Sequence, residues 1–84
     1  MESNQTTNLV DRIQALLVAS LQVSPDEVHP ELAFGDLPQW DSMGHMEVML
    51  ALEMEFGVEI NADTITSLTS LPAIRDYLLE NGHA

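Results

Sequence analysis

The chain has 84 residues, enough for one small domain, and it carries 14 acidic residues against two arginines and no lysine. The formal net charge of −12 disfavours nucleic acid and anionic lipid as partners, while a hydrophobic fraction of 45% favours a packed core over disorder. The absence of cysteine excludes a disulfide framework, a thiol nucleophile and a zinc ribbon, and the three scattered histidines form no helical pair for a metal.

The N-terminus is polar and lacks the basic start of a secretory signal. No apolar run approaches the roughly 20 residues needed to span a bilayer. We therefore expect a cytoplasmic protein with no membrane span. Residues 1–84 are predicted to form a single domain, with about residues 1–6 as a flexible tail.

The first helix is predicted from apolar spacing that begins at Leu9, with Thr7 or Asn8 as its cap. Its stripe consists of Leu9, Val10, Ile13, Leu16, Leu17 and Leu21. The following segment, Ser24-Pro25-Asp26-Glu27, has a capping-box pattern with proline at the first helical position. Pro30 follows too soon for a full helix, so we expect one short turn.

A long connector then leads to Trp40, and we expect Phe34, Leu37 and Trp40 to pin it to the domain. The second long helix is predicted from Ser42 to Phe56, where Gly57 ends it.

Two further helices are predicted after Gly57. Asn61 is a candidate cap for a short helix through about Ser67. Thr69 or Ser70 would cap the last helix, which has Pro72 in its first turn and Gly82 at its end. The buried stripe of that helix would consist of Leu71, Ile74, Tyr77 and Leu78. The predicted fold is therefore all-α, a small bundle of three longer helices plus one or two short helices.

The second long helix has two apolar faces. Placed at 100° per residue, its apolar side chains divide into two stripes on roughly opposite sides. One stripe consists of Val48, Met49, Leu52 and Phe56, and the other of Met43, Met46, Leu50 and Met54. Burial of Glu47 within the second stripe would strand its charge, so we assign the first stripe to the core. The second stripe, bordered by Glu53, is expected to be exposed and to bind partners.

The segment Asp41-Ser42-Met43 at the start of this helix allows three interpretations. Asp41 could simply cap a helix whose first residue is Ser42. Ser42 could be a nucleophile with His45 as its base, although the flanking residues lack the G-x-S-x-G pattern of a hydrolase. Alternatively, Ser42 could carry a phosphate-bearing group, because the free N–H groups and positive dipole end of a helix favour a phosphodiester.

Several segments of the chain match the pattern of one known family. They are Asp41-Ser42-Met43, Glu47, Ala51-Leu52-Glu53, Glu55-Phe56-Gly57-Val58-Glu59-Ile60 and Ile74-Arg75-Asp76-Tyr77-Leu78. With these segments the chain resembles an acyl carrier protein, and the resemblance covers roughly Leu9 to Leu79, including the helix order, the long connector and the acidity.

This resemblance implies that Ser42 receives 4′-phosphopantetheine from coenzyme A through a separate phosphopantetheinyl transferase. The arm would end in a thiol that holds acyl or aminoacyl groups as thioesters. It implies a carrier rather than an enzyme, serving a loading enzyme, an acyltransferase or a ketosynthase with basic docking patches. The docking residues that it implies are Asp41, Met43, Met46, Glu47, Leu50 and Glu53. We expect a monomer.

Some residues depart from typical fatty-acid carriers. Met43 replaces the common leucine, Gly44-His45 stands where acidic or polar residues are frequent, Met54 replaces a frequent acidic residue, and Trp40 precedes the motif. These departures favour a discrete carrier of polyketide or nonribosomal-peptide biosynthesis. Met43 is also typical of D-alanyl carriers, so a D-alanyl or peptidyl carrier stays an alternative. An unmodified acidic module that binds a basic protein is the alternative from another class.

Overall fold

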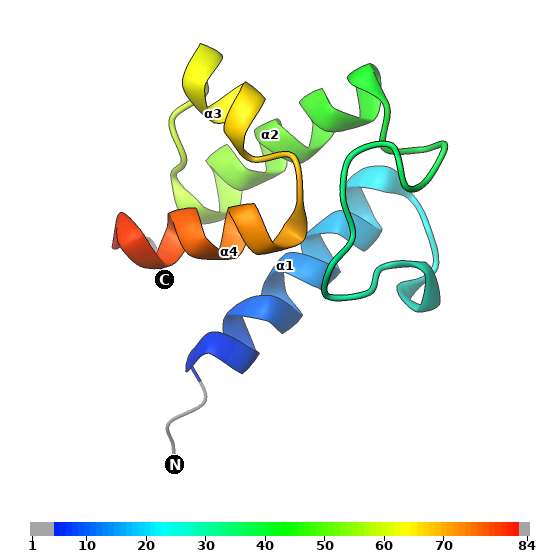
Figure 1. Cartoon of the computed structure of the whole chain (residues 1–84), viewed down its shortest axis with the longest axis horizontal. Coiled ribbons are helices and arrows are strands. Elements are labelled where there is room, and N and C mark those ends of the chain that lie inside the picture. The colour runs from blue at the N-terminus through cyan, green and yellow to red at the C-terminus, as the bar shows by residue number, and fades with distance from the viewer. Residues whose placement is uncertain (1–4, 83–84) are drawn as a thin grey trace.

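The computed structural model describes residues 5–82, and their side chains from residue 8 onward. The elements in chain order are α1 (Gln5–Leu21), the short 3₁₀ helix η1 (Pro25–Glu27), α2 (Ser42–Phe56), α3 (Ala62–Ser67) and α4 (Leu71–Glu80). Helix α1 packs against both α2 and α4, and α3 packs against α2 (Figure 1). Residues 5–82 form no strand beyond one isolated bridge between Ala33 and Ser70. The prediction of a small all-α bundle is confirmed.

Helix α1 begins earlier than the apolar spacing predicts. It starts at Gln5, so the two predicted cap candidates, Thr7 and Asn8, both lie inside the helix. Residues 1–4 of the predicted tail lie outside the described residues. The helix ends at Leu21, because Gln22 adopts a left-handed conformation with φ of 58° and the Val23 N–H donates to the Val18 carbonyl at 3.2 Å.

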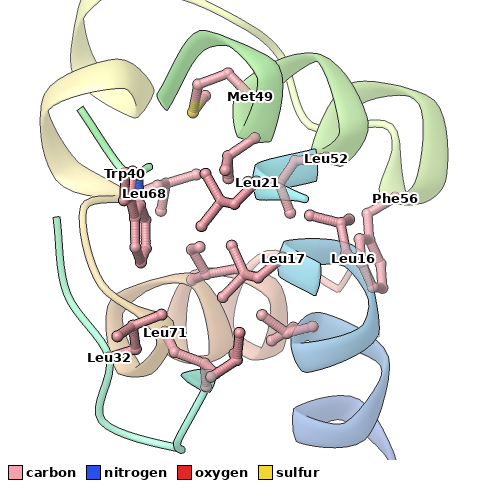
Figure 2. Close-up of a cluster of buried hydrophobic side chains, with 14 of the residues drawn as sticks. Leu16, Leu17, Leu21, Leu32, Trp40, Met49, Leu52, Phe56, Leu68 and Leu71 are labelled. Atoms are coloured by element: carbon pink, nitrogen blue, oxygen red, sulfur yellow. The ribbon is translucent and has the colours of Figure 1, made fainter. Parts of the chain in front are cut away.

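The core lies where α1 crosses the other two long helices. Figure 2 shows Leu17 and Leu21 of α1 at the centre of the cluster, between Met49 and Leu52 of α2 and Leu71 of α4. Burying a leucine of this kind contributes about 1.5–3 kcal/mol, so these few side chains account for much of the domain's stability. The predicted core stripe of α2, Val48, Met49, Leu52 and Phe56, is buried throughout. In α4, Leu71, Ile74 and Leu78 are buried and Tyr77 is half-buried.

The connector between η1 and α2 is held by hydrogen bonds at its start and near its middle. Gln14 Nε2 donates to the Val28 carbonyl at 2.7 Å, and the Phe34 N–H donates to the Thr69 carbonyl at 2.8 Å. Trp40 is fully buried and Leu37 is half-buried, as expected. Phe34 differs from the expectation, because its ring packs edge-on against His45 and 43% of the residue stays exposed.

The helix caps follow the sequence in three places and depart from it in two, at the start of α1 and at Ser24. Asp41, Asn61 and Ser70 each accept a hydrogen bond from a backbone N–H of the following helix, and Asn61 and Thr64 form a reciprocal capping box. The capping box predicted at Ser24 is wrong. The Glu27 N–H instead donates to the Ser24 carbonyl at 3.0 Å, so the 3₁₀ backbone bond takes the donor that the side chain would need. Within residues 5–82, no helix combines the length and apolarity required to cross a membrane.

Candidate functional site

The start of α2 separates a capping residue from a free hydroxyl. Asp41 is extended, and its Oδ1 accepts from the Gly44 N–H at 2.9 Å. The Asp41 carbonyl accepts from the His45 N–H at 2.7 Å, which closes the first turn. Ser42 is the first helical residue and is exposed. Among residues 5–82, none of the hydrogen bonds involves the Ser42 hydroxyl, so this group is available for covalent chemistry.

Gly44 allows the connector to lie directly on the first turn of α2. A Cβ atom at this position would collide with the Gln39 carbonyl and press on the Leu21 side chain. Gln39 of the connector and Leu21 of α1 therefore both lie close against the first turn at Gly44. This close approach fixes the backbone from which Ser42 projects, while Ser42 itself points to solvent.

His45 does not serve as a base for Ser42 in this arrangement. The residue is only 5% exposed, and both of its ring nitrogens are already hydrogen bonded. Nδ1 accepts from the Trp40 indole N–H at 3.1 Å, and Nε2 donates to the Ile65 carbonyl at 2.7 Å. Because a nucleophile needs a base within hydrogen-bond reach that can accept its proton, this geometry gives no support to the nucleophile interpretation.

The second apolar stripe of α2 is exposed, as predicted. Met43 is 81% exposed and Met54 86%, while Met46 and Leu50 are a little less than half exposed. Glu47 and Glu53 are also exposed and border this stripe. We call this surface the methionine face; it consists of Met43, Met46, Glu47, Leu50, Glu53 and Met54. It extends from the residue after Ser42 towards the far end of α2, beside the exposed Asp41.

The sequence interpretation missed the role of His45 and its partners. His45 lies at helical spacing from Met49, Leu52 and Phe56, so the core stripe itself signals that its side chain is buried. Its partners could not be found in this way. Trp40 comes from the connector and Ile65 from α3, and only the folded chain brings these two segments to the same ring.

One other surface feature lies apart from Ser42. A groove of about 530 Å³ lies between α1 and α2. It is lined by Arg12, Ala15, Leu16, Ala19, Ser20, Ala51, Met54 and Glu55. Within residues 5–82, no three His, Asp or Glu side chains gather closely enough to hold a metal ion. Among residues 5–82, the Ser42 hydroxyl is therefore the strongest candidate for the functional group of the protein.

The surroundings of Ser42 fit a covalently attached phosphate-bearing arm. The hydroxyl is exposed and lies at the positive end of a 15-residue helix, which stabilises negative charge by about 0.3–1 kcal/mol. The neighbouring Met43 is also exposed, so the attachment atom lies on the surface of the molecule. The two arginines of the chain are engaged elsewhere, with Glu55 and Asp76, so attachment here would depend on the covalent bond and the helix end.

Comparisons with known proteins agree with this geometry. Residues 11–78 match the family model described as the phosphopantetheine attachment site; the match spans η1, α2 and α3 and most of α1 and α4. The chain is also 31% identical over 72 residues to an acyl carrier protein of Thermosynechococcus vestitus, with 86% of this chain and 89% of that protein covered. On sequence and fold together, the chain belongs to the acyl carrier protein family, whose prosthetic group is 4′-phosphopantetheine.

Proposed function

We propose that Ser42 is the attachment residue for 4′-phosphopantetheine and that the protein shuttles acyl or aminoacyl groups between partner enzymes without catalysing a reaction itself. The observation that carries the proposal is the exposed, unbonded hydroxyl at the start of a helix that another residue caps. The arm supplies a terminal thiol that holds the cargo as a thioester, a group that this cysteine-free chain lacks.

The chain's own contribution is to position the attachment atom. Asp41 holds the first turn through Gly44, which leaves the Ser42 hydroxyl outside the capping interaction. A phosphopantetheinyl transferase would supply the base that removes the hydroxyl proton. The Ser42 oxygen would then bond to the phosphorus next to the pantetheine of coenzyme A, as the pyrophosphate bond breaks and adenosine 3′,5′-bisphosphate leaves.

The methionine face is the proposed docking surface, together with Asp41. Apolar side chains in its centre and carboxylates at its border suit partners that present an apolar patch ringed by basic residues. Such partners would include the transferase, the loading enzyme, and an acyltransferase or ketosynthase. A cytoplasmic location and a monomeric state stay part of the proposal.

Mass spectrometry after incubation with coenzyme A and a broad-specificity transferase tests the attachment. The wild-type protein should gain the mass of one phosphopantetheinyl group, and peptide mapping should place it on Ser42. Ser42→Ala should gain nothing, and its circular dichroism and melting temperature should match the wild type, because the hydroxyl makes no internal hydrogen bond. Ser67→Ala, which also removes an exposed helical serine hydroxyl, serves as the matched control and should be modified normally.

A wild-type protein that stays unmodified with several transferases would overturn the proposal. In that case the methionine face would be explained by the alternative class, an acidic module that binds a basic protein without modification. Ser42→Ala would then leave partner binding and biological activity intact.

We further propose a specialised pathway, polyketide or nonribosomal-peptide biosynthesis, in preference to fatty-acid synthesis. Met43 and Met54 support this assignment, because both are exposed and make the docking surface more apolar. A D-alanyl or peptidyl carrier is the alternative, which Met43 also suits. The mass of the loaded protein purified from its native host distinguishes these cargoes, since each acyl or aminoacyl group adds its own mass to the phosphopantetheinyl form.

A further inference from the structure

One buried imidazole joins three segments around the start of α2. The Trp40 indole N–H donates to His45 Nδ1 at 3.1 Å, and His45 Nε2 donates to the Ile65 carbonyl at 2.7 Å. Because an indole N–H can only donate and a carbonyl can only accept, Nδ1 serves as the acceptor and Nε2 as the donor in these two bonds. We call these two hydrogen bonds the His45 bridge. It ties the connector, α2 and α3 to a single ring.

The His45 bridge is reinforced by aromatic contacts from the connector. The Phe34 ring meets the His45 ring edge-on, with centroids 5.7 Å apart and an interplanar angle of 87°. The Trp40 ring is tilted by 32° to the imidazole, at a centroid distance of 6.2 Å. Phe34 is in turn fixed by its backbone N–H, which donates to the Thr69 carbonyl. The connector therefore surrounds the imidazole from two positions along its length.

The bridge is the main polar link between α3 and the helix that carries Ser42. Within residues 5–82, the bond from His45 to Ile65 is the only hydrogen bond that joins α2 to α3. Helix α3 has six residues, too few to be stable without such contacts. The apolar core joins α1, α2 and α4, and it also includes Leu32 and Trp40 of the connector. Loss of the bridge should therefore release α3 and loosen the connector around Trp40, while the three long helices stay packed.

From these contacts we propose that His45 is a positioning residue, which holds the connector and α3 in place beside Ser42. Partner enzymes then meet one preorganised surface, which consists of the connector, the start of α2 and α3. The inference rests on the proposed function of Ser42. Ser42 and His45 are one helical turn apart, so the ring acts on the same turn as the attachment atom. When only a fraction of the molecules has this surface in place, the apparent affinity for a partner is the intrinsic affinity multiplied by that fraction, while the bound complex reacts as before.

The test is the kinetics of phosphopantetheinylation of the full chain, with coenzyme A and a broad-specificity transferase. His45→Leu removes both hydrogen bonds. If about one molecule in ten keeps the connector and α3 in place, KM for the carrier should rise about tenfold with kcat unchanged. His45→Gln should restore part of the loss, because an amide can accept from Trp40 and donate to Ile65. Trp40→Phe, which removes one bond and keeps an aromatic ring, should give a smaller rise in KM.

A matched control separates positioning from general stability. Ile74→Val weakens the core in α4 without removing either hydrogen bond of the His45 bridge, and should leave KM unchanged. All variants are measured at a temperature at which circular dichroism shows them folded. In NMR spectra, the Trp40 indole N–H of the wild type should exchange slowly with solvent, and in His45→Leu this protection and that of the α3 amides should be lost while α1 stays protected.

The outcomes are distinguishable. A wild-type KM for His45→Leu, or an equal rise for Ile74→Val, would overturn the role of His45 while leaving the attachment at Ser42 intact. An unmodified wild-type protein would instead overturn the proposed function and this inference with it. If His45→Leu fails to fold, His45→Gln and Trp40→Phe decide, and wild-type KM values for both would refute the inference.

Discussion

At the scale of single residues, the start of α2 divides two tasks between neighbours. The side-chain oxygen of an N-cap residue is occupied, because it accepts a hydrogen bond from a backbone N–H of the first turn. Here Asp41 takes that position, with its Oδ1 2.9 Å from the Gly44 nitrogen. Ser42 is one residue further on, so its hydroxyl is free while its backbone is already helical. A serine at the cap itself could not combine an ordered backbone with a free hydroxyl in this way.

Gly44→Ala is expected to destabilise the protein, against the usual trend for helices. Alanine in place of glycine normally stabilises a helix interior by about 0.5–1 kcal/mol. At this position the new methyl group would collide with the Gln39 carbonyl, and such overpacking costs about 1–3 kcal/mol. The melting temperature should fall by about 4–8 °C for each kcal/mol lost.

The neighbouring substitution Met43→Ala controls for this experiment. Met43 lies in the same helical turn but is 81% exposed, so its truncation should leave the free energy of unfolding within about 0.5 kcal/mol of the wild type. A melting temperature of Gly44→Ala at or above that of the wild type would show that the connector does not press on this turn.

His45 shows how far a sequence predicts a residue's role. Its spacing from Met49 and Leu52 places it on the core stripe, which the 3.6-residue period alone indicates. Its nearness to Ser42 along the chain suggested a catalytic base instead. Which interpretation holds depends on Trp40 and Ile65, whose hydrogen bonds consume both ring nitrogens. Contacts between distant segments carry no periodic signal, so this part of the site could not be predicted.

At the scale of the elements, α2 presents different faces to the core and to solvent. Its two stripes were predicted from the sequence because buried and exposed sides repeat with the same period, and Glu47 decided which side faces outward. Whether partners dock on the methionine face is a separate question, and a charge reversal addresses it.

Glu47→Lys should slow the reactions of the carrier with its partners and leave its fold intact. Glu47 is exposed on the methionine face, so its reversal should change the free energy of unfolding by less than about 0.5 kcal/mol. Loss of attraction to basic patches should lower kcat/KM for phosphopantetheinylation roughly tenfold at low salt, and by less as salt screens the charges. Glu53→Lys, on the same face, should act in the same direction.

Glu80→Lys is the control for this charge reversal. It changes the net charge by the same amount but lies at the end of α4. Its kcat/KM should stay close to that of the wild type. Equal effects of Glu47→Lys and Glu80→Lys would mean that only the total charge matters, and an unfolded Glu47→Lys protein would mean that the assignment of the exposed face is wrong.

Helix α3 depends on its N-terminal cap more than the longer helices do. Asn61 Oδ1 accepts from the Thr64 N–H at 2.9 Å, and Thr64 Oγ1 accepts from the Asn61 N–H at 3.0 Å. Asn61→Ala breaks this capping box and should cost about 1 kcal/mol. Hydrogen exchange should accelerate in α3 more than in α1, because the cap acts locally. Thr66→Ala, an exposed position of the same helix whose hydroxyl bonds only within the helix, should be nearly neutral.

The helix boundaries show which local signals are reliable. Asn61 and Ser70 precede helices that tertiary contacts also hold; Asn61 was predicted as a cap, and Ser70 was one of two candidates with Thr69. At Ser24 the same pattern failed, because a single 3₁₀ turn satisfies its donor through the backbone. The start of α1 at Gln5 was also missed, since the apolar stripe that marks the helix begins only at Leu9. An apolar stripe shows which part of a helix is buried. The helix can extend beyond that part at a small cost in free energy.

At the scale of the whole molecule, an apolar core stands against a strongly acidic surface. Both arginines lie beside carboxylates: Arg12 is 3.5 Å from Glu55 and lies over the Phe56 ring, and Arg75 is 3.0 Å from Asp76. With 14 acidic residues and no lysine, most carboxylates have no cation to pair with. The surface charge that would attract basic partners therefore also opposes folding through mutual repulsion.

Added salt should consequently stabilise this protein. Raising NaCl from 0.01 to 0.1 M shortens the screening length from about 30 to about 10 Å, which weakens repulsion between distant carboxylates. The two ion pairs that salt also weakens are exposed or partly exposed and contribute at most about 1 kcal/mol each. We expect a net gain on the order of 1 kcal/mol, or a rise in melting temperature of about 4–8 °C.

Scanning calorimetry in NaCl and in MgCl₂ at equal ionic strength separates screening from cation binding. Screening alone gives equal rises in melting temperature, and a larger rise with MgCl₂ indicates bound Mg²⁺. A melting temperature that stays constant or falls in NaCl would mean that carboxylate repulsion does not limit the stability of the domain.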